Sequence, residues 1–323
     1  MPGVTRGDID AAAERIGADI HRTPVLTSRM LDVRAGRELF FKSEHLQRTG
    51  SFKLRGALNA VRCLSDEVAS RGVITDSSGN FGQALAAAGA AAGVDVTVVM
   101  PSNAPKVKQA AVRGSGGTVV LCPPTLSARK DTVQRLAGSL GATYISSNDH
   151  PHIIAGQGTA ARELLEQVPR LDAIIASVGG GGLLGGTAVV GASADPPVAI
   201  YGAEPRGADD TARSLSAGRH VPAGEHRSVA KGLLVGMGRH PWDIIRRDVA
   251  DVFVVDDSAI VHAMHLLWER MKQVVEPSAA VSLAAALSGG LPPSARRVGI
   301  FLWGGNVVLE PLPWQEGARS VGR

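Results

Sequence analysis

The sequence contains little cysteine. Only Cys63 and Cys122 occur in 323 residues, too few for a disulfide framework or for a zinc site built from thiolates. Residues 1–17 are acidic and amphipathic, with neither the apolar core of a secretory signal nor the acid-free character of a transit peptide. These absences predict a reducing environment, and we expect a cytoplasmic protein.

Long runs of like charge are also absent. Lys and Arg number 34 and Asp and Glu 30, so the net charge is +4, and basic residues are scattered among acids. A nucleic-acid partner is therefore not expected, although the pI is about 9.3. Apolar residues (44%) and charged residues (20%) occur in ordinary globular proportions, and the length suits about two domains.

One uncharged stretch, Ala173 to Ala194, is long enough to span a bilayer. Its centre is the run Gly179 to Gly182, and each glycine inside a helix costs ~1 kcal/mol relative to alanine. We therefore predict a strand, a glycine loop and a helix here, and no membrane association.

Elsewhere short β-rich runs alternate with alanine-rich helical windows. This alternation predicts an α/β fold with two open, twisted, mainly parallel sheets. Residues 72–149 are predicted to form a small α/β domain, inserted into a large discontinuous domain of residues 1–71 and 150–323. A cleft between the two would hold the chemistry. Between Glu204 and Pro241 the pattern lapses, which predicts long loops.

Lysine is scarce, with seven residues in the chain, and Lys53 stands out among them. It lies in the uncharged segment 49–53, where a turn leads into a helical window. An amine in the first turn of a helix meets the positive end of the helix dipole and loses proton affinity, which favours attack on a carbonyl. Its position alone leaves a solvated surface lysine as the alternative.

Two loops between a predicted strand and a predicted helix have the composition of anion sites. Ser77 to Gly82 can direct backbone N–H groups at an anion, or act only as a helix cap. Gly179 to Gly182 can wrap closely around a phosphate. No Walker lysine follows these glycines, which disfavours a P-loop.

The second loop also matches a dinucleotide-binding pattern. Gly180, Gly182 and Gly185 fit G-x-G-x-x-G, and Glu204 follows at the end of the next predicted strand. A Rossmann-type NAD dehydrogenase is therefore an alternative, although it leaves Lys53 without a role.

Six motifs follow one another along the chain. They are Arg22-Thr23-Pro24, Ser51-Phe52-Lys53-Leu54-Arg55-Gly56-Ala57, Ser77-Ser78-Gly79-Asn80, Ala155-Gly156-Gln157-Gly158-Thr159, Gly179 to Gly182, and Gly304-Gly305-Asn306. In this order the chain resembles fold-type II pyridoxal-phosphate enzymes, in particular the serine racemase and threonine (serine) dehydratase group. The resemblance spans about residues 20–310 and implies a fold like the tryptophan synthase β subunit.

The resemblance implies a cofactor and the residues that hold it. Lys53 would bind pyridoxal 5′-phosphate (PLP) as a Schiff base, with Phe52 beside it. Asn80 would hydrogen-bond the ring oxygen of PLP, and Gly179, Gly180, Gly181 and Gly182 would bind its phosphate.

The resemblance also implies a substrate site and a metal site. The substrate would contact Ser78, Gly79, Asn80 and Arg129, and Ser78 would be a second acid/base facing Lys53. Glu204, the carbonyl of Ala208 and Asp210 would bind a divalent cation, and their oxygen atoms suit Mg²⁺ or Ca²⁺. A solvated acidic turn is the alternative for this last segment.

The implied reaction starts from a small β-hydroxy amino acid such as threonine or serine. Loss of water and then of ammonia would give a 2-oxo acid, with Lys53 removing the Cα proton and PLP accepting electron density. Racemisation of serine through Ser78 is the closest alternative. Because this family commonly dimerises, a homodimer is expected.

Trp303 is the largest departure from the family pattern. Members usually have Ser or Thr before Gly-Gly-Asn, whose hydroxyl meets the pyridine nitrogen, whereas an indole can only donate. Overpacking a filled site costs ~1–3 kcal/mol, so either the ring is turned aside, or the cofactor sits differently, or cofactor binding is impaired. A non-catalytic or altered-specificity protein is thus another alternative. Phe81, Ser146 and Lys231 also depart from serine racemase, which indicates a substrate other than plain serine.

Overall fold

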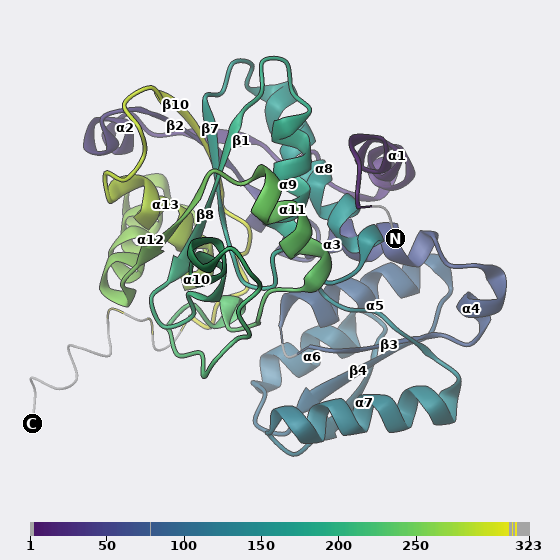
Figure 1. Ribbon diagram of the computed structural model, residues 1–323. Coiled ribbons are helices and arrows are strands. Elements are labelled where there is room, and N and C mark those ends of the chain that lie inside the picture. Colours follow the sequence, from purple (N-terminus) through teal and green to yellow (C-terminus); the bar gives the residue numbers. More distant parts are fainter. Residues whose placement is uncertain (1–2, 78, 310–311, 313, 315–323) are drawn as a thin grey trace, which may run out of the picture.

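The computed structural model describes residues 3–77, 79–309, 312 and 314. Ten strands in these residues form two sheets (Figure 1). The larger sheet has six strands, all parallel except for the β1–β2 pair. Their spatial order is β1 (Val25–Thr27), β2 (Glu38–Lys42), β10 (Arg297–Phe301), β7 (Ala173–Ser177), β8 (Ala199–Pro205) and β9 (Asp251–Val255).

The smaller sheet is entirely parallel. Its order is β5 (Thr118–Cys122), β4 (Val96–Pro101), β3 (Val73–Asp76) and β6 (Thr143–Tyr144). Helices α4 (Asp66–Ser70), α5 (Asn80–Ala92), α6 (Lys106–Gly114) and α7 (Leu126–Leu140) accompany it. The predicted fold class of two mainly parallel α/β sheets is confirmed, while the domain boundaries at 71/72 and 149/150 stay a prediction.

The remaining helices surround the larger sheet. In Figure 1 α12 and α13 lie on one side of its strands and α9 and α11 on the other. They are α1 (Arg6–Ile16), α2 (Arg29–Ala35), α3 (Lys53–Arg62), α8 (Pro151–Gln167), α9 (Gly182–Ala192), α10 (Asp210–Ala217), α11 (Arg239–Asp248), α12 (Asp257–Met271) and α13 (Pro277–Leu287), with short 3-10 turns η1 (Gly17–Asp19), η2 (Glu44–Leu46) and η3 (Lys231–Leu233).

The segment from Glu204 to Pro241, predicted as loops, contains helix α10. Arginine and serine obscure its apolar pattern, but Thr211 and Ser214 are buried nonetheless. Within the described residues, no helix has the length and apolar character needed to cross a bilayer.

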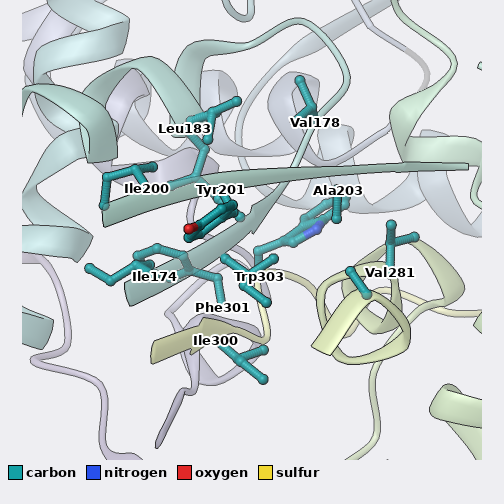
Figure 2. Packing of buried hydrophobic residues seen from close by; sticks show 14 of the residues in the cluster. Ile174, Val178, Leu183, Ile200, Tyr201, Ala203, Val281, Ile300, Phe301 and Trp303 are labelled. Atoms are coloured by element: carbon teal, nitrogen blue, oxygen red, sulfur yellow. The ribbon is translucent and has the colours of Figure 1, made fainter. Parts of the chain in front are cut away.

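The main core lies on both faces of the larger sheet. Figure 2 shows Ile174, Ile200 and Phe301 from three of its strands packed together, with Val281 of α13 nearby. All five residues of β7 are buried, as expected of a parallel strand covered on both faces. Trp303 belongs to this cluster.

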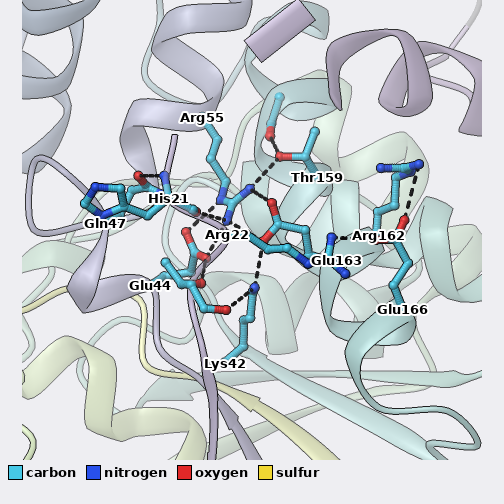
Figure 3. A network of polar contacts seen from close by, with 12 residues as sticks. His21, Arg22, Lys42, Glu44, Gln47, Arg55, Thr159, Arg162, Glu163 and Glu166 are labelled. Carbon is cyan, nitrogen blue, oxygen red and sulfur yellow. Dashed lines mark hydrogen bonds and ion pairs between the residues drawn. The ribbon is translucent and has the colours of Figure 1, made fainter. Parts of the chain in front are cut away.

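A buried network of paired charges anchors helix α3 (Figure 3). The Arg55 guanidinium donates to both carboxylate oxygens of Glu44 and to both of Glu163, at 2.7–2.9 Å. Lys42 Nζ donates to Glu163 Oε2 at 2.7 Å and to the Thr23 carbonyl at 2.8 Å. Two cations thus face two carboxylates, so no charge in the network is left uncompensated.

Helix α3 also packs closely on α8. A Cβ at Gly56 would lie 2.9 Å from the Ile153 carbonyl oxygen, and one at Gly156 would lie 2.5 Å from the Arg55 carbonyl oxygen. Only glycine permits this approach of the two backbones. Two glycines of the motifs thus fix the helix that begins at Lys53.

Candidate active site

Lys53 is the first residue of α3, and its preceding residues are tied to the end of β10. Ser51 forms an antiparallel bridge with Gly304, and the Phe52 N–H donates to the Trp303 carbonyl at 3.1 Å. The Lys53 amine donates to the Ser147 carbonyl at 3.0 Å and lies 5.0 Å from the centre of the Phe52 ring. No carboxylate of the described residues forms an ion pair with it.

Burial lowers the pKa of Lys53 to about 8, since desolvation disfavours the charged amine. The sequence predicted a lowered proton affinity from the helix dipole, whereas desolvation is the main cause in the structure. Roughly a tenth of the amine is therefore neutral at pH 7, far more than for a solvated lysine, and this fraction can act as a nucleophile or base.

The glycine loop connects β7 to α9 and faces the same cavity as Lys53. Gly181 has a φ of +83°, a conformation that favours glycine. A Cβ at Gly180 would lie 2.2 Å from Asn148 Cγ, and one at Gly182 would lie 2.5 Å from Gln157 Oε1. The loop therefore brings bare backbone to the N-terminus of a helix, an arrangement that binds phosphate.

The cavity at Lys53 is small, at about 30 Å³. Besides the predicted residues Phe52, Lys53, Gly179 to Gly182 and Trp303, it is lined by Asn148, Ser177, Leu183, Gly232 and Leu233. Sequence analysis missed these five as site residues. Asn148 donates to the Gly180 carbonyl at 2.9 Å, so it supports the glycine loop.

Trp303 packs into the core at the edge of this cavity, with 3% of its surface exposed. Its indole N–H donates to the Ser278 carbonyl at 3.1 Å, and its ring meets Phe52 edge to face at 5.6 Å. A Cβ at Gly232 would lie 2.7 Å from the ring atom Cη2. The indole is turned into the core, where Figure 2 shows it among apolar side chains. It also lines the cavity.

Asn80 belongs to a separate group of hydrogen-bonded polar side chains. Its Nδ2 donates to Glu276 Oε1 at 2.7 Å, and its Oδ1 accepts from Asn306 Nδ2 at 2.8 Å. Burial raises the pKa of Glu276 to about 7. Gly79 and Asn80 line a neighbouring cavity of about 220 Å³. Glu276 was missed, although its place before Pro277 at a helix start was a signal.

Arg129 is not among the residues that line the Lys53 cavity. Its Nε lies 3.1 Å from Asp76 Oδ2, and the Tyr144 hydroxyl donates to Asp76 Oδ1 at 2.6 Å. The structure thus places Arg129 in a polar group at the end of β3. Ser78, the predicted second acid/base, lies outside the described residues.

The predicted metal ligands lie apart from Lys53, at the end of β8 and the start of α10. Glu204, Ala208 and Asp210 are all buried. Burial raises the pKa of Glu204 to about 8.

A reactive lysine beside a phosphate-type glycine loop, between two parallel α/β sheets, defines the class of enzyme that binds an aldehyde cofactor through an amine. A sequence model described as "Pyridoxal-phosphate dependent enzyme" matches residues 16–303. The chain belongs to this family of PLP-dependent enzymes, and the predicted resemblance is confirmed. A Rossmann-type dehydrogenase is thereby set aside.

Three relatives illustrate the likeness. A serine racemase of Dictyostelium discoideum is 46% identical over 97% of this chain and 98% of its own, and its crystal structure gives a TM-score of 0.90. A beta-hydroxyaspartate dehydratase of Paracoccus denitrificans is 42% identical over 96% of this chain and 98% of its own. The crystal structure of a T.th. threonine deaminase is 40% identical with a TM-score of 0.90, over 95% of this chain and all of its own (100%).

The chemistry of the site fits PLP. The Lys53 amine has a lowered pKa, and a Cβ on Gly180 or Gly182 would fill the cradle beside it. Space limits the fit of PLP more than chemistry does, because the cavity is small and Trp303 is the bulkiest residue that lines it.

Proposed function

We propose that this protein is a PLP-dependent dehydratase that converts a β-hydroxy amino acid to a 2-oxo acid and ammonia. The carrying observation is the Lys53 amine, whose pKa is lowered to about 8 in a cavity walled by the glycine loop. The names of the Paracoccus dehydratase and the T.th. threonine deaminase support this reaction class.

In this proposal the tasks are divided between the residues that line the Lys53 cavity and Asn80, which lines the neighbouring cavity. The backbone N–H groups of Gly179 to Gly182 bind the phosphate of PLP, and Asn80 orients the cofactor ring. When bound, PLP accepts electron density from the substrate Cα. Lys53 Nζ takes the proton from that Cα. The Ser147 carbonyl, which accepts a hydrogen bond from this amine at 3.0 Å, orients it.

The substrate side is proposed from Ser78, Gly79, Asn80 and Arg129. Because two relatives are named for hydroxyaspartate, a substrate with a second carboxylate belongs in any test. Arg129 Nε lies 3.1 Å from Asp76 Oδ2 but has no hydrogen-bond partner, so the guanidinium keeps a donor for an acidic group of the substrate.

Amino-acid racemisation at the same site is the second candidate, supported by the serine racemases among the relatives. It requires a second acid/base on the opposite face of the substrate, which we assign to Ser78.

We also propose that the protein is a cytoplasmic homodimer. The cation at Glu204, Ala208 and Asp210 is a separate question, addressed in the next subsection.

The test is a panel assay of the purified, PLP-loaded protein. Threonine, serine and the 3-hydroxyaspartate isomers are each incubated with the protein, 2-oxo acid release is measured, and remaining substrate is analysed by chiral chromatography. We expect 2-oxo acid from at least one of them. Inverted substrate without 2-oxo acid would make the protein a racemase, and no change in any substrate would favour a non-catalytic protein.

A further inference from the structure

The acidic pair Glu204 and Asp210 lies outside the cofactor cavity. Each of its four carboxylate oxygens has a nitrogen neighbour in the structure. The two side chains are 0% and 2% exposed. Buried carboxylates require partners, either N–H donors or a cation. The family resemblance implies a divalent cation, so the first question is whether their oxygens are free to bind one.

Both oxygens of Glu204 accept backbone hydrogen bonds. Oε1 accepts from the Thr211 N–H at 3.1 Å, and Oε2 accepts from the Ala212 N–H at 2.9 Å. These N–H groups belong to the first turn of α10, where they have no partner within the helix. Glu204 therefore acts as a cap for α10 with both oxygens engaged.

Both oxygens of Asp210 also have nitrogen neighbours. Oδ2 accepts from the Met237 N–H at 3.1 Å. Oδ1 lies 3.1 Å from Nε2 of His226, whose side chain is only 7% exposed. The two atoms are close but are not aligned for a hydrogen bond, so Nε2 has no hydrogen-bond partner.

The segment that carries His226 lies directly against the acidic turn. The Arg227 N–H donates to the Gly207 carbonyl at 2.9 Å, and a Cβ at Gly207 would lie 1.8 Å from the Arg227 carbonyl oxygen. Glycine at position 207 therefore lets the two backbones touch. This contact holds the imidazole against Asp210.

The arrangement does not fit a magnesium or calcium site. Such ions take six or more oxygen ligands. Here the imidazole nitrogen of His226 adjoins Asp210 Oδ1, and backbone N–H groups donate to the other three carboxylate oxygens of Glu204 and Asp210. We propose that His226 occupies the place of the divalent cation, so that the fold around α10 is independent of metal.

The experiment compares the PLP-loaded wild-type protein with His226→Ala. Thermal unfolding is followed with chelator, and then with excess Mg²⁺, Ca²⁺ or Mn²⁺. We expect the wild-type Tm to stay the same throughout. The Tm of His226→Ala should fall by at least about 2 °C, and cations should restore part of this loss because they bind only the folded carboxylates.

Three controls make the outcomes decisive. His226→Gln serves if the alanine variant does not fold, His262→Ala removes an exposed histidine and should change nothing, and His226→Ala with Asp210→Asn should lose the response to cations. A wild-type Tm that falls with chelator and recovers with a cation would overturn the proposal. So would a His226→Ala protein that matches wild type or ignores cations. PLP absorbance, recorded in parallel, tests the proposed function separately.

Discussion

Two basic groups, the half-buried Lys53 and the buried Arg55, lie only two residues apart in helix α3 and have opposite surroundings. Arg55 contacts two carboxylates, Glu44 and Glu163, through four hydrogen bonds (Figure 3). Lys53 has one carbonyl and two aromatic rings near its amine. A buried charge whose partners are complete is tolerated by the fold, and removing one partner is strongly destabilising. A poorly solvated amine without a counter-charge instead keeps a lowered pKa and is available for chemistry.

The acids of the network show the same contrast. Burial by itself would raise the pKa of Glu163, but the hydrogen bonds and charges of Arg55 and Lys42 lower it overall. No such partner opposes the desolvation of Lys53. Replacing each basic residue by methionine therefore separates function from stability.

The largest expected effect is that of Lys53→Met on turnover. Without the amine, 2-oxo acid release should fall by at least ~10³-fold, because the base is lost. The free energy of unfolding of the cofactor-free protein should stay the same or rise, since a poorly solvated amine is removed. Product assay and urea unfolding measure the two quantities. Retained turnover would refute the role of Lys53.

Arg55→Met should give the reverse pattern. Removing the guanidinium leaves Glu44 and Glu163 buried with only Lys42 to oppose them, which should cost ~3–5 kcal/mol of unfolding free energy. Any folded fraction should still bind PLP. Denaturant titration gives the free energy, and a loss below ~1 kcal/mol would show that the network contributes little.

Gly180→Ala should weaken PLP binding by ~10- to 100-fold, because the added Cβ collides with Asn148 and overpacking costs ~1–3 kcal/mol. Gly185→Ala is the matched control. Its Cβ would meet nothing closer than 3.7 Å, so affinity should not change. Titration of both cofactor-free proteins with PLP measures Kd, and equal affinities would exclude the loop as the cradle.

Trp303→Phe should have a smaller effect. It removes the indole N–H donated to Ser278, which should lower stability by ~1 kcal/mol. The smaller ring also enlarges the cavity, so PLP should bind a few-fold more tightly. Kd from absorbance and Tm from calorimetry are the measurements. Weaker PLP binding would indicate that the indole contributes a favourable cofactor contact.

The smallest effect concerns pH. The pKa of Lys53 is about 8 in the folded protein and 10.5 in its usual state, so between these values the unfolded chain binds more protons. Stability contributed by this group therefore rises with pH across that window. Wild-type minus Lys53→Met unfolding free energies, measured without cofactor on both sides of the window, should show the rise. A flat difference would place the amine in a solvated state.

The sequence predicted those parts of the site that lie in continuous motifs. Segment 49–53 is bridged to Gly304, just after β10, and the glycine run follows β7, the parallel neighbour of β10. Both segments therefore lie at the same edge of the larger sheet and line one cavity. Asn148 and Leu233 could not be selected in this way, since they come from other segments and belong to none of the motifs. Ser177 lies two residues before the glycine run and Gly232 follows Lys231, so for these two a signal was present in the sequence. The partners of Arg55 lie 11 and 108 residues away in sequence, a pairing that spacing does not reveal.

The last strand of the described residues is also the one that joins the two halves of the larger sheet. β10 lies between β2 and β7, so during synthesis the two flanking groups of strands have no common neighbour until residues 297–301 emerge. The bridge from Ser51 to Gly304 forms only after that. A nascent chain therefore carries two unprotected strand edges until β10 has been made, and the Lys53 amine meets the finished pocket only after residue 304 has been added.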